Sequence, residues 1–251
     1  MNKPFLSIII PAYNEEKRIK NSLAKLINFI ESNNKLNFEI IIIDDGSRDN
    51  TNSIIKDFFL NCHSNYLNYF NFVLVENLIN RGKGYSVRRG LEKASGNYIL
   101  FTDADLSTPL EESLKMIDIL KNGYDIVIGS RALKKSLIIK RQNIIREYMG
   151  KFFNFIVRKI TKLNFFDTQC GFKMFTKKAV KLLLPYLKID DFSFDVEILY
   201  IANKLNLKIK ELPVIRANSP NSKVNIIKDP IKMFLSLLKI RFKIFNKNII
   251  D

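Results

Sequence analysis

The sequence predicts an α/β fold in which a mostly parallel sheet is flanked by helices. Short apolar runs alternate with segments of helical periodicity through the first half of the 251-residue chain. This alternation is typical of parallel sheets covered on both sides. Residues 6–10 and 39–43 are almost wholly apolar, as expected for strands buried on both faces. Polar residues then gather directly after the strand ends, where open α/β sheets bind their ligands.

Local signals define the individual elements. Residues 6–10 form the first strand, and Asn14 with the two glutamates behind it favours a helix start. Ile19, Leu23 and Ile27 then share one helical face. The further predicted strands are residues 39–43, 72–75, 98–101, 125–128, a strand ending near 175, and 208–214. The further predicted helices are residues 84–93, 109–121, 143–161, 194–205 and 230–245.

The charge balance indicates an anionic partner. Lys and Arg number 41 against 25 Asp and Glu, which gives a formal net charge of +16. Nucleic acid, anionic lipid and a phosphorylated substrate would each match this charge, and a lysine-rich composition without functional meaning is the alternative. Cys62 and Cys170 are far apart and His63 is the single histidine. These counts argue against a disulfide framework, a zinc site and histidine-based catalysis.

Asp103, Ala104 and Asp105 directly follow the predicted strand 98–101. Two carboxylates this close repel each other unless a positive charge lies between them. Mg²⁺ meets that need, because it binds one or two carboxylates together with substrate phosphate oxygens. The alternative is a turn or a helix cap, where Asp is also common. The position at a strand end, beside other acidic loops, favours the metal site.

Two further loops carry residues suited to a nucleotide. Asp45 follows the strand 39–43 and can accept a hydrogen bond from a nucleoside, whereas Asp49 is suited to cap the helix that begins near Thr51. Lys83 lies between glycines just before a helix, where free backbone N–H groups suit a diphosphate. The spacing differs from that of a P-loop, which argues against an ATPase.

Taken together, the motifs resemble those of the GT-A family 2 glycosyltransferases. The segments that carry the resemblance are Pro11-Ala12-Tyr13-Asn14-Glu15, Asp44-Asp45-Gly46-Ser47, Gly82-Lys83-Gly84 and Asp103-Ala104-Asp105-Leu106-Ser107. Two later segments are similar to the dolichyl-phosphate glucosyltransferase and polyprenyl-phosphate sugar synthase branch. They are Asp167-Thr168-Gln169-Cys170-Gly171-Phe172 and Phe194-Asp195-Val196-Glu197. The similarity extends over about residues 6–223, which we expect to form the catalytic domain.

The resemblance implies a nucleotide-sugar donor, with UDP-glucose favoured, and a polyprenyl or dolichyl phosphate acceptor. The residues that would bind the nucleoside are Pro11, Ala12, Tyr13, Glu15, Ile43 and Asp45. The residues that would bind the diphosphate or close over it are Lys83, Asp103, Ala104, Arg131, Arg216 and Lys223. Asp103 and Asp105 would hold Mg²⁺ or Mn²⁺, and the implied catalytic residues are Asp105, Asp195 and Arg131.

The acceptor side is expected to involve Gln169, Asp195 and Glu197. A lipid phosphate is already an anion near neutral pH and needs little help from a base. If the acceptor were a sugar hydroxyl, as in surface polysaccharide synthesis, Asp195 or Glu197 would have to act as the base. These two lie two residues apart on one helix, so at most one should reach the site, and surface charge is the alternative for both. Cys170 is expected to be a small packed residue.

Two other classes of protein fit the sequence less well. A nucleotidyltransferase would carry a glycine-rich phosphate loop after its first strand, and this chain does not. A nucleic-acid-binding protein would place acidic loops against a polyanion, and no binding motif is recognisable. The partners expected from the sequence are therefore a nucleotide sugar and a lipid phosphate, with no nucleic acid.

Residues 224–251 are expected to form a basic amphipathic appendage. Its apolar face would comprise Ile231, Phe234, Leu235, Leu238, Phe242 and Phe245, with Lys232, Lys239, Arg241 and Lys243 around it. Such a helix can lie on an anionic membrane surface or pack on the core, and both possibilities stay open. The chain shows no signal peptide and no apolar run of roughly 18 residues. We therefore expect a cytoplasmic protein, peripheral on the cytoplasmic face of a membrane and without a transmembrane helix.

Overall fold

The computed structural model describes residues 3–66, 70–138, 144–216 and 228–243. The strands are β1 (Leu6–Ala12), β2 (Phe38–Asp44), β3 (Phe70–Glu76), β4 (Tyr98–Thr102), β5 (Ile126–Ser130), β6 (Leu137–Ile138), β7 (Phe172–Thr176), β8 (Ile209–Pro213) and β9 (Ile215–Arg216). The helices are α1 (Ile19–Ser32), α2 (Thr51–Tyr66), α3 (Lys83–Lys93), α4 (Glu112–Lys121), α5 (Ile144–Thr161), α6 (Lys177–Leu183), α7 (Phe194–Lys204) and α8 (Lys228–Lys243). A short 3₁₀ turn, η1 (Leu184–Tyr186), follows α6.

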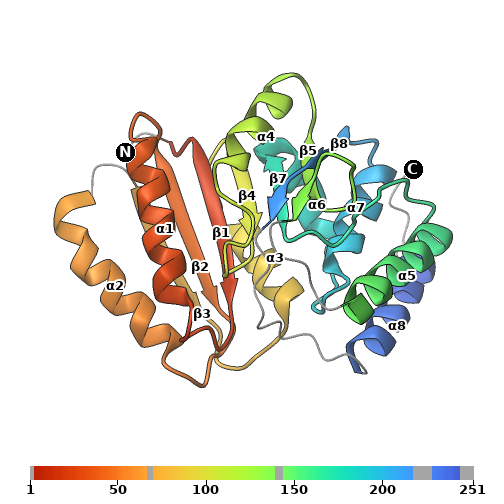
Figure 1. The fold of residues 1–251 in the computed structure, drawn as a ribbon, viewed down its shortest axis with the longest axis horizontal. Coiled ribbons are helices and arrows are strands. Elements are labelled where there is room, and N and C mark those ends of the chain that lie inside the picture. The colour runs from red at the N-terminus through yellow and green to blue at the C-terminus, as the bar shows by residue number, and fades with distance from the viewer. Residues whose placement is uncertain (1–2, 67–69, 139–143, 217–227, 244–251) are drawn as a thin grey trace.

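A seven-stranded sheet in the order β3-β2-β1-β4-β7-β5-β8 forms the centre of the molecule (Figure 1). β7 runs antiparallel to its neighbours β4 and β5, and the other pairs are parallel. One hydrophobic cluster joins the sheet to α1, α2 and α4, and a second joins it to α3, α6, α7 and α8. The predicted α/β fold with a mostly parallel, helix-flanked sheet is confirmed.

The first helix begins later than the sequence indicated. Asn14 was the predicted start, yet α1 begins at Ile19 and Asn14 adopts a positive φ of 52°. The N–H groups of Asn14 and Glu15 donate to Ser47 Oγ and Thr51 Oγ1, at 2.9 and 2.6 Å. These partners lie more than thirty residues away in the chain, so local capping rules could not reveal them. The predicted start was wrong because tertiary bonds hold the segment as a loop.

The helix α8 has two apolar stripes where the sequence suggested one. Its buried side is formed by Met233, Ser236, Leu237 and Ile240, which pack towards α5 and α7. Phe234, Leu235 and Phe242, from the predicted apolar face, are exposed. The helix therefore packs on the core and still presents apolar side chains to the outside. The proposed boundary at residue 223 lies outside the described residues and stays a prediction.

No helix among residues 3–66, 70–138, 144–216 and 228–243 is long and apolar enough to cross a bilayer.

Candidate active site

The loops after β1 and β2 are bound to each other at the carboxyl edge of the sheet. The N–H of Asp45 donates to the Ala12 carbonyl at 2.8 Å. The N–H of Arg48 donates to Asn14 Oδ1 at 2.8 Å. Asp49 accepts the N–H of Thr51 at 3.0 Å, so it supports the start of α2 as predicted. The convergence of these loops on one edge, predicted from the sequence, is confirmed.

The residues predicted to bind the nucleoside line this edge in different ways. Pro11, Ala12 and Ile43 are buried, and Tyr13 is half-buried. Glu15 is buried and ion-paired with Arg18, whose Nη2 lies 2.7 Å from Glu15 Oε1. The Tyr13 side chain is thus the most accessible of the four apolar or aromatic positions.

Asp45 binds the loop that precedes α3. Its Oδ1 accepts hydrogen bonds from Asn77 Nδ2 and the Arg81 N–H, at 2.8 and 3.0 Å. Its Oδ2 accepts from Asn80 Nδ2 and the Gly82 N–H, at 2.9 and 2.8 Å. Four hydrogen bonds occupy the acceptor sites of this carboxylate. A nucleoside would have to replace one of these donors, and the contact predicted for Asp45 stays a prediction.

Backbone N–H groups at the start of α3 are already used. The amides of Gly84 and Tyr85 donate to the Asp190 carbonyl, at 2.8 and 3.4 Å. A Cβ on Gly82 would lie 2.4 Å from the same carbonyl oxygen, so the loop containing Asp190 is packed directly against the turn. The expectation of free N–H groups for a diphosphate was wrong for these residues. Lys83, in contrast, directs its ammonium to the carboxylate of Asp103.

Lys83 and Asp103 form an ion pair at the end of β4. Lys83 Nζ lies 2.5 Å from Asp103 Oδ1, and both side chains are 25% exposed. Burial alone would lower the pKa of Lys83, but the carboxylates of Asp103 and Asp195 outweigh it and raise that pKa. The backbone N–H of Asp103 donates to the Gly171 carbonyl at 3.1 Å. The sequence did not reveal that Lys83 and Asp103 are neighbours.

The carboxylates of Asp103 and Asp105 are matched by cations of this chain. Besides the Lys83 contact to Asp103, Arg18 Nη1 lies 3.7 Å from Asp105 Oδ2. The Ser107 N–H donates to Asp105 Oδ1 at 3.0 Å. Across the described part of the chain, no three His, Cys, Asp or Glu side chains gather as a metal site. Two carboxylates fit a Mg²⁺ or Mn²⁺ ion that completes its shell with substrate phosphate oxygens.

Arg131 is bound to Asp167 in a bidentate ion pair. Its Nε and Nη2 lie 2.6 and 2.7 Å from the two Asp167 oxygens, and its backbone N–H also donates to Asp167 at 3.0 Å. Burial alone would raise the pKa of Asp167, but Arg131 outweighs it and lowers the pKa to about 2. Asp167 is buried, whereas the Arg131 side chain is 31% exposed. Part of the Arg131 side chain therefore stays accessible to a ligand.

Asp167→Asn is expected to lower the free energy of unfolding by ~2 kcal/mol at pH 7. The folded-state pKa of Asp167 lies below its ordinary value of 3.8, so its stabilisation is present above about pH 4 and is lost as the pH falls towards 2. Urea unfolding between pH 7 and pH 2.5 measures the difference from wild type, which should narrow in acid. Asp118→Asn, at an exposed acid, is the control. A difference that is constant with pH contradicts this role.

Asp195 forms a buried ion pair with Lys173. Lys173 Nζ lies 2.5 Å from Asp195 Oδ1 and 2.7 Å from the Cys170 carbonyl oxygen. Burial raises the pKa of Asp195, although Lys173 and Lys83 oppose the shift. Surface charge, one alternative for Asp195, is therefore wrong. Lys173 was missed in the sequence, although a lysine inside an apolar strand is a signal that could have found it.

Glu197 lies on another side of α7 from Asp195. Its carboxylate accepts hydrogen bonds from the backbone N–H groups of Lys188 and Ile189, at 2.8 and 3.0 Å. Burial raises the pKa of Glu197 to about 7, although these N–H groups oppose the shift. Surface charge is wrong for this residue too, because it is buried. Its predicted contact with the acceptor stays a prediction.

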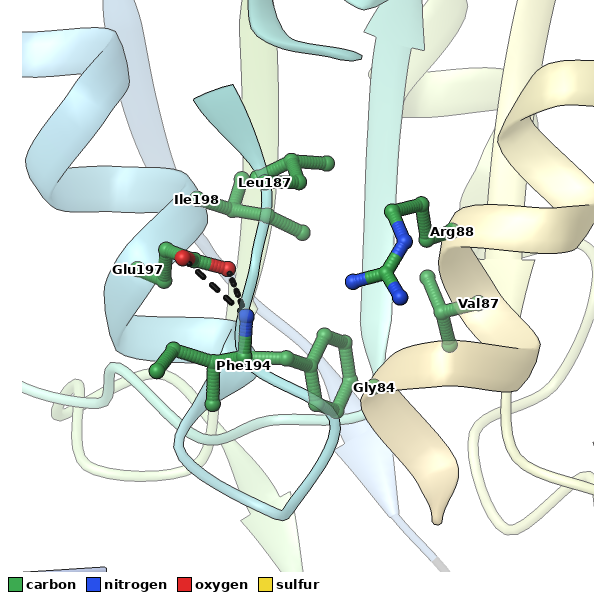
Figure 2. A pocket seen from close by; sticks show the side chains of 8 residues that line it. Gly84, Val87, Arg88, Leu187, Phe194, Glu197 and Ile198 are labelled. Carbon is green, nitrogen blue, oxygen red and sulfur yellow. Dashed lines mark hydrogen bonds between the residues drawn. The ribbon is translucent and has the colours of Figure 1, made fainter. Parts of the chain in front are cut away.

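A mostly apolar pocket lies between α3 and α7, with Glu197 and Arg88 on opposite walls (Figure 2). The other residues that line it are Gly84, Val87, Leu187, Ile189, Phe194 and Ile198. Arg88 Nη2 lies 2.7 Å from Asp190 Oδ1. Of the predicted site residues, only Glu197 lines this pocket.

The remaining predicted residues differ in how far they can be placed. Gln169 is half-buried, and its Nε2 donates to the Phe192 carbonyl at 3.4 Å. Cys170 is buried, as predicted for a packed residue. Ala104 is buried beside the two aspartates. The side chain of Arg216 and the whole of Lys223 lie outside the described residues.

Comparison with known proteins identifies the family. A family model described as glycosyl transferase family 2 matches residues 7–184. The chain belongs to glycosyl transferase family 2. Two relatives named dolichyl-phosphate beta-glucosyltransferase resemble this glycosyltransferase over nearly its whole length. The Dictyostelium discoideum protein is 36% identical, and the match covers 95% of this chain and 74% of the length of that protein. The Saccharomyces cerevisiae protein is 37% identical, and the match covers 94% of this chain and 74% of the length of that protein.

Solved structures confirm the GT-A type of fold for this family 2 glycosyltransferase. Glucosyl-3-phosphoglycerate synthase from Mycobacterium tuberculosis, in complex with phosphoglyceric acid, matches with a TM-score of 0.68 at 18% identity. That match covers 95% of this chain and 80% of the other. The same enzyme with Mn²⁺, UDP-glucose and glycerol 3-phosphate matches with a TM-score of 0.66 at 17% identity, over 95% and 80%. At these identities the likeness shows the fold alone.

Proposed function

We propose that this protein transfers glucose from UDP-glucose to a polyprenyl or dolichyl phosphate, with inversion at the anomeric carbon. The similarity to dolichyl-phosphate beta-glucosyltransferases over about 95% of the chain carries the proposal. The site supports it, because cationic and acidic side chains alternate where a diphosphate and a phosphate acceptor would meet. These residues are Arg18, Lys83, Arg131 and Lys173 together with Asp103, Asp105, Asp167 and Asp195.

On the donor side, the nucleoside is bound by the residues at the carboxyl edge of the first two strands, which are Pro11, Ala12, Tyr13, Glu15, Ile43 and Asp45. Asp103 and Asp105 would hold Mg²⁺ or Mn²⁺, and the ion would neutralise the charge that develops on the leaving diphosphate. When the donor binds, the Lys83 ammonium would replace its contact with Asp103 by one with a phosphate oxygen. The accessible part of Arg131 would contact the same diphosphate. Arg216 and Lys223 are also proposed for the donor side, and the Arg216 side chain and the whole of Lys223 lie outside the described residues. The chain's own part is to position the diphosphate and to neutralise its charge.

On the acceptor side, the lipid phosphate attacks as an anion. The second pKa of a phosphate monoester is about 6, so most of it is dianionic at neutral pH. It therefore needs little help from a base, and the residues proposed for the acceptor side are Gln169, Asp195 and Glu197. In the alternative reaction, with a sugar hydroxyl, a carboxylate base would be required. Asp195 is paired with Lys173, and Glu197 with two backbone N–H groups, so the lipid phosphate is favoured.

The exposed stripe of α8 supports a peripheral position on a membrane surface, and we propose that this is the cytoplasmic face. Phe234, Leu235 and Phe242 are exposed, and Lys232 and Lys239 are exposed on the same helix. Apolar side chains flanked by lysines suit the boundary between headgroups and acyl chains of an anionic bilayer. A lipid acceptor would be reached from that surface.

A donor screen tests the proposal. The purified protein is incubated with polyprenyl phosphate, Mg²⁺ or Mn²⁺, and a panel of UDP- and GDP-sugars. We expect transfer from UDP-glucose above all other donors, and none when EDTA removes the metal. Absence of product with every donor, together with no metal-dependent nucleotide binding, would sink the proposal.

A further inference from the structure

Lys173 is a charged residue inside an otherwise apolar strand. It lies on β7 (Phe172–Thr176), which is the strand between β4 and β5, and it pairs in register with Phe101 and Ile128. The loops of the site follow both neighbouring strands. The Lys173 side chain is 0% exposed, so its ammonium does not reach a ligand in this arrangement. Any role in transfer must pass through the groups that it contacts.

The contacts of Lys173 lead to both sides of the site. Its ammonium is fixed by the Cys170 carbonyl and by Asp195, whose carboxylate lies in the first turn of α7. Asp195 in turn stabilises the charged form of Lys83, which is paired with Asp103. Charges of opposite sign therefore follow one another from the core to the acidic loop after β4.

Stability alone does not account for the buried pair of Lys173 and Asp195. Desolvation of two charges offsets most of their attraction, and apolar residues of similar volume often stabilise a core as well or better. A buried pair does fix two groups in one arrangement, because either charge left alone is costly. The pair thus has the properties of a positioning device.

We propose that Lys173 is a positioning residue for glycosyl transfer, because its buried ammonium fixes the Asp195 carboxylate at the start of α7. This role rests on the function proposed above, in which Asp195 acts on the acceptor side. Lys173 itself touches no substrate.

A double-mutant cycle on kcat tests this role. Lys173→Met, Asp195→Asn and the double variant are compared with wild type at saturating UDP-glucose and polyprenyl phosphate. We expect each single substitution to lower kcat by at least about tenfold, and the double variant to match Asp195→Asn within about threefold, since residues that act as a unit are not additive. Lys178→Met, at an exposed lysine on α6, is the control and should keep wild-type kcat.

Three results would overturn the role of Lys173. They are a kcat for Lys173→Met within threefold of wild type, a double variant in which the two losses multiply, and additive shifts of the urea unfolding midpoint. If Lys173→Met does not fold, the double variant is used in its place, because it leaves neither charge unpaired. A kcat of the double variant that is a further tenfold below that of Asp195→Asn decides against the role. Wild type that transfers to no lipid phosphate defeats the proposed function instead. The unfolding cycle then tests only whether Lys173 and Asp195 are coupled in the fold.

Discussion

Asp105→Asn is expected to lower kcat by at least about a thousandfold, because a metal-supplied stabilisation of several kcal/mol depends on this carboxylate. Asp105 lies just after β4 with one oxygen on the Ser107 N–H and the other facing Arg18. The amide of asparagine keeps the size and the bond to Ser107 but loses the charge. The loss should therefore fall on turnover and leave the fold intact.

Steady-state kinetics and a thermal melt of the same preparation measure this effect. Asp57→Asn, at an exposed position on α2, is the matched control and should keep wild-type kcat. Metal-dependent nucleotide binding should also be lost in Asp105→Asn and kept in the control. Unchanged activity of Asp105→Asn would remove the metal role assigned to this residue.

Gly171→Ala is expected to lower kcat by about a hundredfold, the loss typical of a reacting group displaced by about 1 Å. A Cβ at Gly171 would lie 2.2 and 2.3 Å from the two carboxylate oxygens of Asp103. No real contact is that short, so the carboxylate must move away from its position beside Lys83. Gly171 is not among the glycines with a positive φ, so alanine does not strain the backbone itself. The damage should be local to Asp103.

Gly150→Ala is the control for this substitution, because among the described residues nothing beyond its chain neighbours and the backbone of its own helix lies within 4 Å of the added Cβ. It should keep wild-type kcat and leave the melting temperature unchanged or slightly raised, since alanine favours a helix. Both variants are assayed for kcat, UDP-glucose affinity and thermal melting. Full activity of Gly171→Ala would show that transfer does not depend on the observed position of the Asp103 carboxylate.

Much of the fold could be predicted because burial determines the pattern of the strands. β1 and β2 are apolar throughout their centres, and both lie between helical layers. The direction of a strand leaves no such mark, since parallel and antiparallel neighbours bury the same side chains. The antiparallel course of β7 was therefore not predictable. The start of α1 escaped prediction for a related reason, because Ser47 and Thr51 bind its leading segment from across the fold.

The candidate site divides in the same way. The position of Asp103 and Asp105 at the end of a strand could be predicted from the apolar run before them, and their role in ligand binding stays a prediction. The partner of each charge could not be predicted. Lys173 joins Asp195 across a separation of 22 residues, and Asp167 joins Arg131 across 36. Such ion pairs depend on how the helices and strands pack. The sequence therefore showed which residues are charged, and the structure showed which of them are paired.

Product analysis with UDP-[¹⁴C]glucose tests directly whether the acceptor is a lipid phosphate. The purified protein receives equal amounts of polyprenyl phosphate, the matching polyprenol and a glycan with free hydroxyls, with Mg²⁺ or Mn²⁺ present. If the acceptor is a lipid phosphate, label appears only in polyprenyl glucosyl phosphate, with the β configuration expected from inversion, and UDP is released. Label in the glycan, with none in the lipid phosphate, would contradict a lipid phosphate acceptor.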